Sequence, residues 1–446
     1  MIAVLWKDSS LYEQSSVYRG VSMAAHKLKS GPSSRVTASP SVVHHEVVIV
    51  GGGTAGITVA ARLTNGWFNH LDVAVVEPSA RHFYQPAWTL VGAGAYRKQD
   101  TVRDEAAVMP RKATWIRDAV ETFDPENNRI VTHEGTVITY KYLVVAAGIQ
   151  INWGSIPGLK ESVGHDGVCS NYSFETVEST WETLKNFKGG TALFTQPKGA
   201  VKCGGAPQKI AYLAEDYLRI HGLRDKTRIV FAAPVNEIFA VEKYRNVLQQ
   251  VVERKGIETM FEHELVAIHP DRREAVLEHV ETHALTTMSY DMLHVTPPMS
   301  APDFISRSVL ADSKGWVDVN PQTLQHTRFP NVFALGDCSN LPTSKTGAAI
   351  RKQAPVLVRN LRAFMAGQPL QAAYTGYTSC PVVTGYGTMV LAEFGYDKQP
   401  DETFPFNQAK ERWSMWIFKK YLLPFMYWHG MLKGRMENRE RIFCLW

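Results

Sequence analysis

Apolar residues along this chain gather in short, nearly unbroken runs, which is the pattern of strands buried on both faces of a sheet. These predicted strands cover 46–50, 71–78, 140–150, 191–194, 227–234 and 329–340. A helical repeat follows the first of them, over 57–63. Strands that alternate with helices predict an α/β fold built on Rossmann-like sheets.

The first strand continues into a glycine-rich turn within HEVVIVGGGTAGITVAARL at 45–63. Gly51, Gly53 and Gly56 have the G-x-G-x-x-G spacing that permits a tight turn, close approach of a pyrophosphate and close helix–strand packing. The next strand ends in Glu77, whose carboxylate can accept hydrogen bonds from an adenosine ribose. Together these features predict a dinucleotide-binding site.

Two later segments favour FAD over NAD at this site. The strand at 140–150 runs into a small-residue turn at Gly148, where a flavoprotein chain returns beneath the dinucleotide. The strand at 329–340 ends in Gly336 and Asp337, and an aspartate there can bind the ribityl hydroxyls of a flavin. In this order the segments resemble the two-dinucleotide-binding-domain flavoproteins, in which an inserted second domain splits the FAD domain.

The inserted domain of that family normally carries its own glycine fingerprint for NAD(P)H. The corresponding stretch here, PKGAVKCGGAPQKIAYLAEDYL at 197–218, lacks the fingerprint. The strand at 227–234 also ends without an acid for a ribose or an arginine for a phosphate. We therefore expect no NAD(P)H site and a different electron donor.

The cysteines are too few and too scattered for a secreted disulfide scaffold, and no C-x-x-C pair or close Cys/His cluster indicates a metal site. Cys203 lies at the centre of the 197–218 stretch, and Cys380 lies in a Gly/Tyr-rich loop at 374–387. Such a pair can exchange a disulfide for a dithiol or persulfide if both face one flavin. Spacing alone leaves open the alternative that each is a buried structural cysteine.

Longer matches identify a narrower family. Over residues 44–432 the chain resembles the mitochondrial sulfide:quinone oxidoreductases of animals and fungi. The matching segments are 75–95, 201–215, 292–303, 315–326, 336–346, 376–387 and 424–434. The resemblance implies that Cys203 and Cys380 are the paired redox cysteines, and core packing is expected for the other three, Cys169, Cys338 and Cys444.

The resemblance also implies a non-covalently bound FAD. With the motifs above, its candidate contacts are Gly51, Gly53, Thr54, Ala55, Gly56, Glu77, Gln85, Val120, Gly148, Gly336, Asp337, Lys345, Thr346, Gly347 and Ala348. Lys345, Lys209 and Lys419 are candidate positive charges near reduced flavin or anionic sulfur, although the last two are equally compatible with a solvated surface position. His82 and Tyr84 are expected to pack around the flavin.

Two departures from the family pattern concern the helix starts. Thr54 and Ala55 stand where relatives often carry Ser-Gly, and Arg351 with Lys352 makes the segment after Lys345 unusually basic. A solvated position is expected for the basic pair.

The implied activity is oxidation of hydrogen sulfide through a cysteine persulfide, with two electrons passed by FAD to ubiquinone. The sulfane sulfur then goes to an acceptor such as glutathione, sulfite, cyanide or coenzyme A. Two alternatives stay open at this point. One is a type II NADH:quinone oxidoreductase, which the missing second fingerprint opposes, and the other is a non-catalytic FAD-binding scaffold.

The resulting domain plan has five parts. They are a mitochondrial transit or disordered leader (1–43), two parts of an FAD domain (44–160 and 306–404), an inserted Rossmann-like domain (161–305) and an amphipathic membrane-associating region (405–446). The leader assignment rests on the absence of acidic residues between Gln14 and His45, among basic, serine and alanine residues. We expect a peripheral, monotopic protein of the mitochondrial inner membrane.

The net charge of +5 resides in the tail, where residues 410–446 contain eight Lys or Arg against three acids. No basic stripe runs through the rest of the sequence, so nucleic-acid binding is not expected. Trp413, Trp416 and Ile417 are predicted to share one helical face, which Phe425, Trp428 and Leu432 repeat. Aromatic faces with basic flanks favour helices lying in the lipid headgroups, and packing on the protein's own core is the alternative. Removing residues after about 405 is therefore expected to spare FAD binding.

Overall fold

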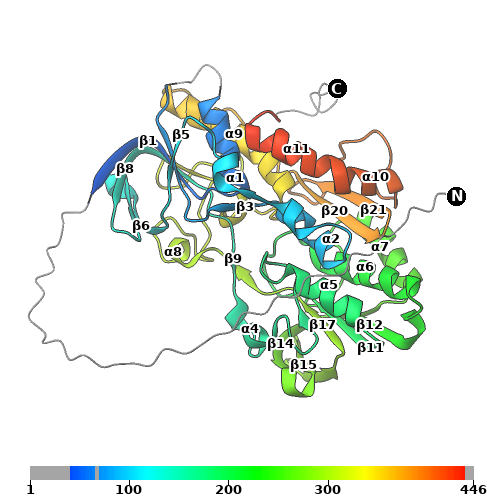
Figure 1. The fold of residues 1–446 in the computed structure, drawn as a ribbon. Coiled ribbons are helices and arrows are strands. Elements are labelled where there is room, and N and C mark those ends of the chain that lie inside the picture. The colour runs from blue at the N-terminus through cyan, green and yellow to red at the C-terminus, as the bar shows by residue number, and fades with distance from the viewer. Residues whose placement is uncertain (1–40, 66–69, 437–446) are drawn as a thin grey trace, which may run out of the picture. The chain divides into compact units, whose positions relative to one another are not determined.

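The computed structural model describes residues 41–65 and 70–436, and Figure 1 shows its elements. Residues 1–40 of the expected leader and the tail from residue 437, which includes Cys444, lie outside the described residues.

A seven-stranded sheet carries the glycine-rich turn. Its strands are β1 (Val42–Val50), β2 (Val73–Val76), β5 (Ala113–Ile116), β6 (Val120–Asp124), β7 (Arg129–Thr132), β8 (Val137–Val145) and β19 (Val332–Ala334). The order is β5–β2–β1–β8–β7–β6, with β19 also paired to β8. The pairs β6–β7 and β7–β8 are antiparallel, and the other pairs are parallel. Helices α1 (Thr54–Thr64) and α9 (Gly347–Met365) pack against each other and contact its strands.

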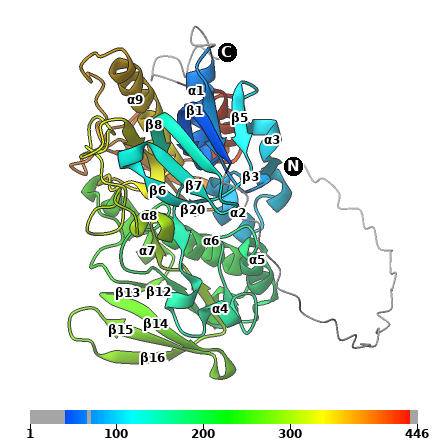
Figure 2. The same cartoon turned by 90° about the vertical axis from the view of Figure 1, so that its left-hand side faces the viewer.

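A second sheet follows in the chain between β8 and β19. It has the order β10–β17–β11–β12–β13 and is parallel throughout. Figure 2 shows an antiparallel three-stranded sheet beside it. The strands and helices of this part are β10 (Val168–Cys169), α5 (Val177–Asn186), β11 (Gly190–Thr195), α6 (Ala206–Ile220), β12 (Thr227–Ala233), α7 (Glu242–Arg254), β13 (Glu258–Phe261), β14 (His263–His269), β15 (Glu274–His279), β16 (Leu285–Ser289) and β17 (Met292–Val295).

This arrangement confirms the predicted α/β class with one Rossmann-like sheet interrupted by another, because β19 returns to the first sheet after the whole second sheet. The exact domain boundaries stay predictions. Short connecting elements are β3 (Arg81–Phe83), α2 (Trp88–Gly92), β4 (Val102–Asp104), α3 (Glu105–Val108), β9 (Gln150–Ile151), α4 (Leu159–Ser162), β18 (Met299–Ser300) and α8 (Asp303–Ser306).

The last part of the described chain contacts helices that pack on both sheets. The hairpin of β20 (Thr378–Gly385) and β21 (Thr388–Phe394) packs on α6 and contacts α9. The C-terminal segment then runs through α10 (Trp413–Ile417), the π-helical turn η8 (Phe418–Leu422), α11 (Leu423–His429) and the turn η9 (Met431–Lys433). Figure 1 shows α10 and α11 in red, with α11 near α1 and α9.

The C-terminal segment differs from the predicted helical faces. Trp416 and Trp428 are buried, whereas Trp413, Tyr421 and Phe425 are 67%, 59% and 59% exposed. The predicted grouping is wrong because the buried face follows Met415, Trp416 and Lys419 before Pro424, and Tyr427 and Trp428 after it, which leaves Trp413 and Phe425 on the outer side. The segment therefore packs one face on the core and presents a different aromatic face outward.

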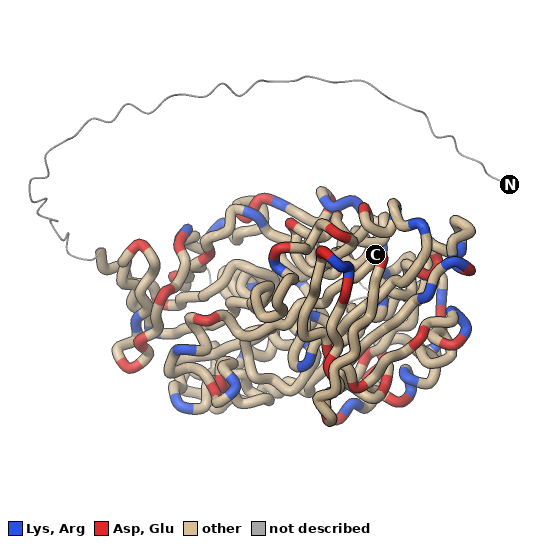
Figure 3. The backbone as a smooth tube through the Cα atoms, turned by 90° about the horizontal axis from the view of Figure 1, so that it is seen from below, with Lys and Arg blue, Asp and Glu red and all other residues tan. Residues whose placement is uncertain are grey.

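Two further observations bear on the tail and the charges. None of the helices within 41–65 and 70–436 has the length and apolar character needed to cross a bilayer. Figure 3 shows basic and acidic residues interspersed along the described backbone, in keeping with the balanced charge outside the tail.

Candidate active site

A cavity of about 420 Å³ opens where β1, β8 and β19 end. Side chains and backbone from α1, α6, α9, β20, β21 and the C-terminal segment also line it. The candidate residues that it brings together are Gly51, Gly53, Thr54, Ala55, Glu77, Gln85, Gly148, Cys203, Lys209, Asp337, Lys345, Thr346, Gly347, Ala348 and Lys419. Ligands collect at the carboxyl edge of such sheets, so this is the expected place for a dinucleotide.

The glycine fingerprint has the geometry that a pyrophosphate needs. Gly51 has φ +102°, and a Cβ there would lie 2.6 Å from the carbonyl oxygen of Ala146. A Cβ on Gly56 would lie 1.8 Å from the carbonyl oxygen of Gly51, so this glycine allows α1 to pack closely without lining the cavity. Gly53, by contrast, faces open space at the start of α1, as does Gly347 at the start of α9. These open backbone positions fit the close approach of FAD phosphates.

Glu77 lies at the end of β2 beside this turn. Its carboxylate accepts hydrogen bonds from the backbone N–H groups of Gly52 and Ser79, both at 2.7 Å. Burial raises the pKa of Glu77, and the two backbone hydrogen bonds oppose that rise. The carboxylate is thus held rigidly at the edge of the cavity, as ribose recognition requires.

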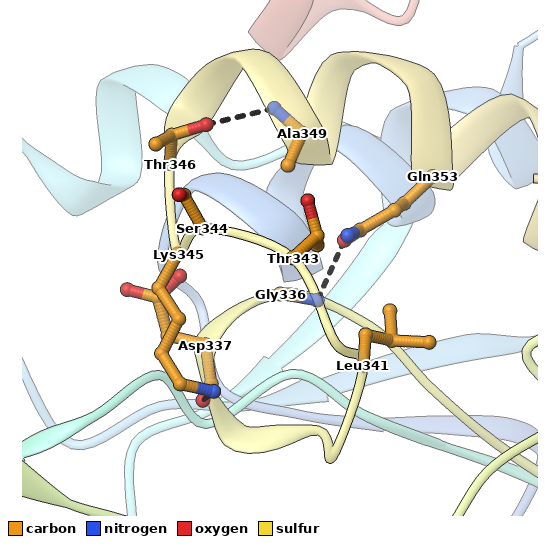
Figure 4. A pocket seen from close by; sticks show the side chains of 9 residues that line it. All are labelled: Gly336, Asp337, Leu341, Thr343, Ser344, Lys345, Thr346, Ala349 and Gln353. Atoms are coloured by element: carbon orange, nitrogen blue, oxygen red, sulfur yellow. Dashed lines mark hydrogen bonds between the residues drawn. The ribbon is translucent and has the colours of Figure 1, made fainter. Parts of the chain in front are cut away.

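Asp337 and Lys345 form the opposite wall, shown with their neighbours in Figure 4. The Lys345 Nζ donates to the carbonyl oxygens of Asp337 (2.6 Å) and Ser339 (3.0 Å). Burial raises the pKa of Asp337, while the ammonium groups of Lys345 and Lys202 oppose that rise. Gly336 lines a smaller adjoining pocket rather than the main cavity, and its N–H donates to Gln353 at 2.9 Å. Lys345 therefore fixes the loop that presents Asp337.

Cys203 and Cys380 lie side by side, with 3.2 Å between their Sγ atoms, although 177 residues separate them in sequence. Cys203 lines the cavity in a left-handed backbone conformation (φ +58°), and its N–H donates to the carbonyl oxygen of Lys345 at 2.9 Å. Gly205, the N-cap of α6, makes room for the second sulfur, because a Cβ there would lie 2.5 Å from the Cys380 Sγ.

Two buried lysines line the same cavity as Cys203. The Lys209 Nζ lies 3.2 Å from the Cys203 Sγ, and the Lys419 Nζ donates to the carbonyl oxygen of Pro86 at 2.8 Å. The hydrogen bond from the Cys380 thiol and the Lys209 charge lower the pKa of Cys203, whereas the pKa of Cys380 is raised. Burial and the Lys209 charge lower the pKa of Lys419 to about 7. The surface alternative is wrong for both lysines.

Other predictions have mixed outcomes. Val120 is buried in the core at the start of β6 and does not line the cavity. Cys169 and Cys338 are buried, which confirms their packing positions. Arg351 lines the cavity and donates to the Tyr377 hydroxyl at 3.0 Å, so the expected solvated position is wrong for it.

Several cavity residues were not predicted from the sequence. Lys202 donates to Gln85 (2.9 Å) and to the carbonyl oxygen of Tyr172 (3.0 Å), and burial lowers its pKa to about 8. Tyr427 of α11 reaches the cavity from the C-terminal segment. Only its aromatic character and the adjacency of Lys202 to Cys203 hinted at these positions.

Comparison with known proteins places this geometry in a family. Residues 45–355 match the family described as pyridine nucleotide-disulphide oxidoreductase. The mitochondrial sulfide:quinone oxidoreductase of Mus musculus is 49% identical over 395 residues, which cover 88% of this chain and 87% of that protein. The chain belongs to the sulfide:quinone oxidoreductase family. The mitochondrial sulfide:quinone oxidoreductase of Dictyostelium discoideum is 48% identical over 400 residues, with 89% and 88% covered.

A solved structure agrees at the level of the fold. The sulfide:quinone oxidoreductase of Aquifex aeolicus superposes with a TM-score of 0.78 at 19% identity, over 90% of this chain and 94% of that one. Family membership makes the chain a flavin-dependent oxidoreductase with a mitochondrial location, as in its relatives. It also favours this assignment over the NADH:quinone oxidoreductase and scaffold alternatives.

Proposed function

We propose that this protein oxidises hydrogen sulfide at Cys203 and Cys380 and passes two electrons to ubiquinone. The observation that carries the proposal is the 3.2 Å contact between the two sulfurs at the wall of the dinucleotide cavity. Bound FAD, held without a covalent bond, supplies a two-electron acceptor that can be reoxidised by quinone. The contacts proposed for it are the cavity-lining candidates, with Gly56 supporting the turn.

In the first step the two cysteines start as an oxidised pair joined through sulfur. Hydrosulfide attacks the Cys380 sulfur, which becomes a persulfide, and the bond to Cys203 breaks to release its thiolate. The Lys209 ammonium, 3.2 Å away, stabilises this thiolate and so makes Cys203 the better leaving group.

The second step regenerates the pair. A nucleophilic acceptor such as glutathione, sulfite, cyanide or coenzyme A removes the outer sulfur and leaves Cys380 as a thiolate. The two thiolates then rejoin as a disulfide, an oxidation whose two electrons, which originated from sulfide, would pass to bound FAD as the oxidant. Lys419, buried on the other side of the site, adds positive charge that attracts anionic sulfur species.

The apolar residues of the cavity lining suit the quinone. They include Ile350, Leu391, Phe404, Phe418, Leu423 and Met426. Arg351 also lines the cavity, and its guanidinium can donate to a quinone carbonyl oxygen. Phe418, Leu423 and Met426 belong to the C-terminal segment. The apolar lining therefore lies beside the surface proposed to meet the membrane.

We propose that the protein binds the inner mitochondrial membrane on one side only. Trp413, Tyr421 and Phe425 are exposed, and the same segment contains basic residues, among them Lys420 and Lys433. Exposed aromatic residues next to basic ones favour the headgroup region of anionic lipid.

An anaerobic titration tests the function. Sulfide added to the FAD-loaded protein is expected to bleach the visible flavin absorbance, and a short-chain ubiquinone analogue is expected to restore it. NADH serves as the matched control and is expected to leave the absorbance unchanged. Bleaching by NADH but not by sulfide would contradict the proposal.

A further inference from the structure

The C-terminal segment does more than present an outer face, because it also closes the dinucleotide cavity. Lys419, Leu423, Met426, Tyr427 and Met431 all line that cavity. Two contacts hold the far end of the segment near α1: the side-chain amide of Asn65 donates to the carbonyl oxygen of Lys433 at 2.9 Å, and η9 packs on α1. This segment is therefore a wall of the cofactor site.

Tyr427 makes the polar connection in this wall. Its hydroxyl lies 2.8 Å from the Thr54 Oγ1, at the first residue of the fingerprint helix, and 2.7 Å from the His82 Nε2. The His82 Nδ1 in turn lies 3.1 Å from the Glu105 Oε2. Tyr427, His82 and Glu105 are all buried, so water does not replace these hydrogen bonds while the segment is closed.

Aromatic packing surrounds the same hydroxyl. The rings of Tyr84 and Tyr427 lie 4.7 Å apart, and that of Trp428 lies 5.9 Å from His82. Gly52 leaves no spare room behind the chain of hydrogen bonds, since a Cβ there would lie 2.9 Å from the Glu105 Oε1. Thr54 begins α1, His82 lies in β3 and Glu105 begins α3, whereas Tyr427 comes from the segment that carries the outward aromatic face.

We propose that Tyr427 is a positioning residue for the flavin cofactor, which fastens the C-terminal segment over the dinucleotide site so that the bound cofactor and the closed segment stabilise each other. The inference rests on FAD occupying this cavity. Linkage makes the effect reciprocal, because a cofactor that contacts the closed segment must favour its closure. This geometry argues against the expectation that loss of residues after 405 spares FAD binding.

The test measures release of flavin from the full-length holoprotein after dilution into FAD-free buffer, followed by flavin fluorescence. Tyr427→Phe keeps the ring and removes only the hydroxyl, and it is expected to speed release about tenfold, as loss of one buried hydrogen bond implies. Tyr421→Phe is the matched control, because Tyr421 belongs to the same segment but is exposed. It is expected to release flavin at the wild-type rate.

A second measurement separates positioning from general instability. Thermal unfolding is followed with and without saturating FAD for wild type and both variants. A positioning role predicts that FAD raises the midpoint less in Tyr427→Phe than in wild type. If FAD raises the unfolding midpoint equally in all three proteins, or if all three release flavin at the same rate, the role of Tyr427 is overturned while the proposed function stands. A wild-type protein that binds no flavin would overturn the proposed function as well.

Discussion

The effect of the Lys209 charge on the Cys203 thiolate can be estimated from the structure. Lys209→Met keeps a long side chain in a buried position and removes the ammonium that lies 3.2 Å from the Cys203 Sγ. Two unit charges at that distance attract by about 5 kcal/mol at an effective dielectric constant of about 20. Because desolvation of a buried ion pair cancels part of this attraction, we use the range for a hydrogen bond to a charged group, about 1.5–3 kcal/mol.

That energy favours the Cys203 thiolate over the thiol in the native protein. Its loss is expected to reduce the thiolate population at neutral pH about 10- to 100-fold, since about 1.4 kcal/mol corresponds to a factor of ten. The direction follows from the lowered pKa of Cys203, to which both the Cys380 hydrogen bond and the Lys209 charge contribute. Only the second contribution disappears in the variant, so a higher pH is expected to restore the thiolate.

The assay is the rate of alkylation of Cys203 by iodoacetamide in the reduced protein, measured by peptide mass spectrometry over a range of pH. The profile of Lys209→Met is expected to move to higher pH and to converge with wild type in strongly alkaline buffer. Lys226→Met is the matched control, because Lys226 is exposed and lies in the turn between α6 and β12. Superimposable profiles for Lys209→Met and wild type would refute the reasoning.

Three further changes test other parts of the site. Gly205→Ala places a methyl group 2.5 Å from the Cys380 Sγ, so sulfide-dependent flavin bleaching is expected to slow at least about tenfold while FAD stays bound, and an unchanged rate would argue against close sulfur packing. The charge of Lys419 is expected to be lost as pH rises through about 7. The rate of attack per unit concentration of hydrosulfide should therefore fall across that window in wild type but not in Lys419→Met, and a fall that persists in the variant would assign it to another group. Replacing Trp413, Tyr421 and Phe425 together by serine removes the outward aromatic face and is expected to abolish sedimentation with cardiolipin-containing liposomes while the flavin spectrum is retained; continued sedimentation would place the membrane contact elsewhere.

Local signals in the sequence predicted the dinucleotide half of the site well. Gly51, Gly53 and Glu77 act through backbone conformation and strand ends, which depend on neighbours in sequence. The same is true of Asp337, whose strand returns to the first sheet as β19. Such features can be predicted without knowing how distant segments meet.

The sulfur pair shows where local reasoning ends. Nothing in the spacing of Cys203 and Cys380 requires that they meet, because the contact depends on how β20 packs on α6. Tyr427 is similar, since its partners Thr54 and His82 precede it by most of the chain. The prediction for the tail was wrong for a different reason: it grouped the aromatic residues by spacing alone, and spacing does not show that Lys419 is buried with Trp416 while Trp413 is exposed.

Burial of charge was equally hard to predict. Lys209 and Lys419 resemble ordinary surface lysines in sequence, yet both are buried in the lining of the cavity, and the Lys209 Nζ lies 3.2 Å from the Cys203 Sγ. Such a position is tolerated because anionic sulfur and backbone carbonyl groups compensate the charge, and that compensation exists only in the folded site.

Peptide mapping of the two cysteines before and after one equivalent of sulfide, under anaerobic conditions, is the most direct test of the reaction assigned to them. The resting protein is expected to yield one peptide pair joined between positions 203 and 380. After sulfide the pair should separate, with one added sulfur on Cys380 and an alkylatable thiol at Cys203. Two free cysteines in the resting enzyme, with no added sulfur on either after a turnover, would contradict the account.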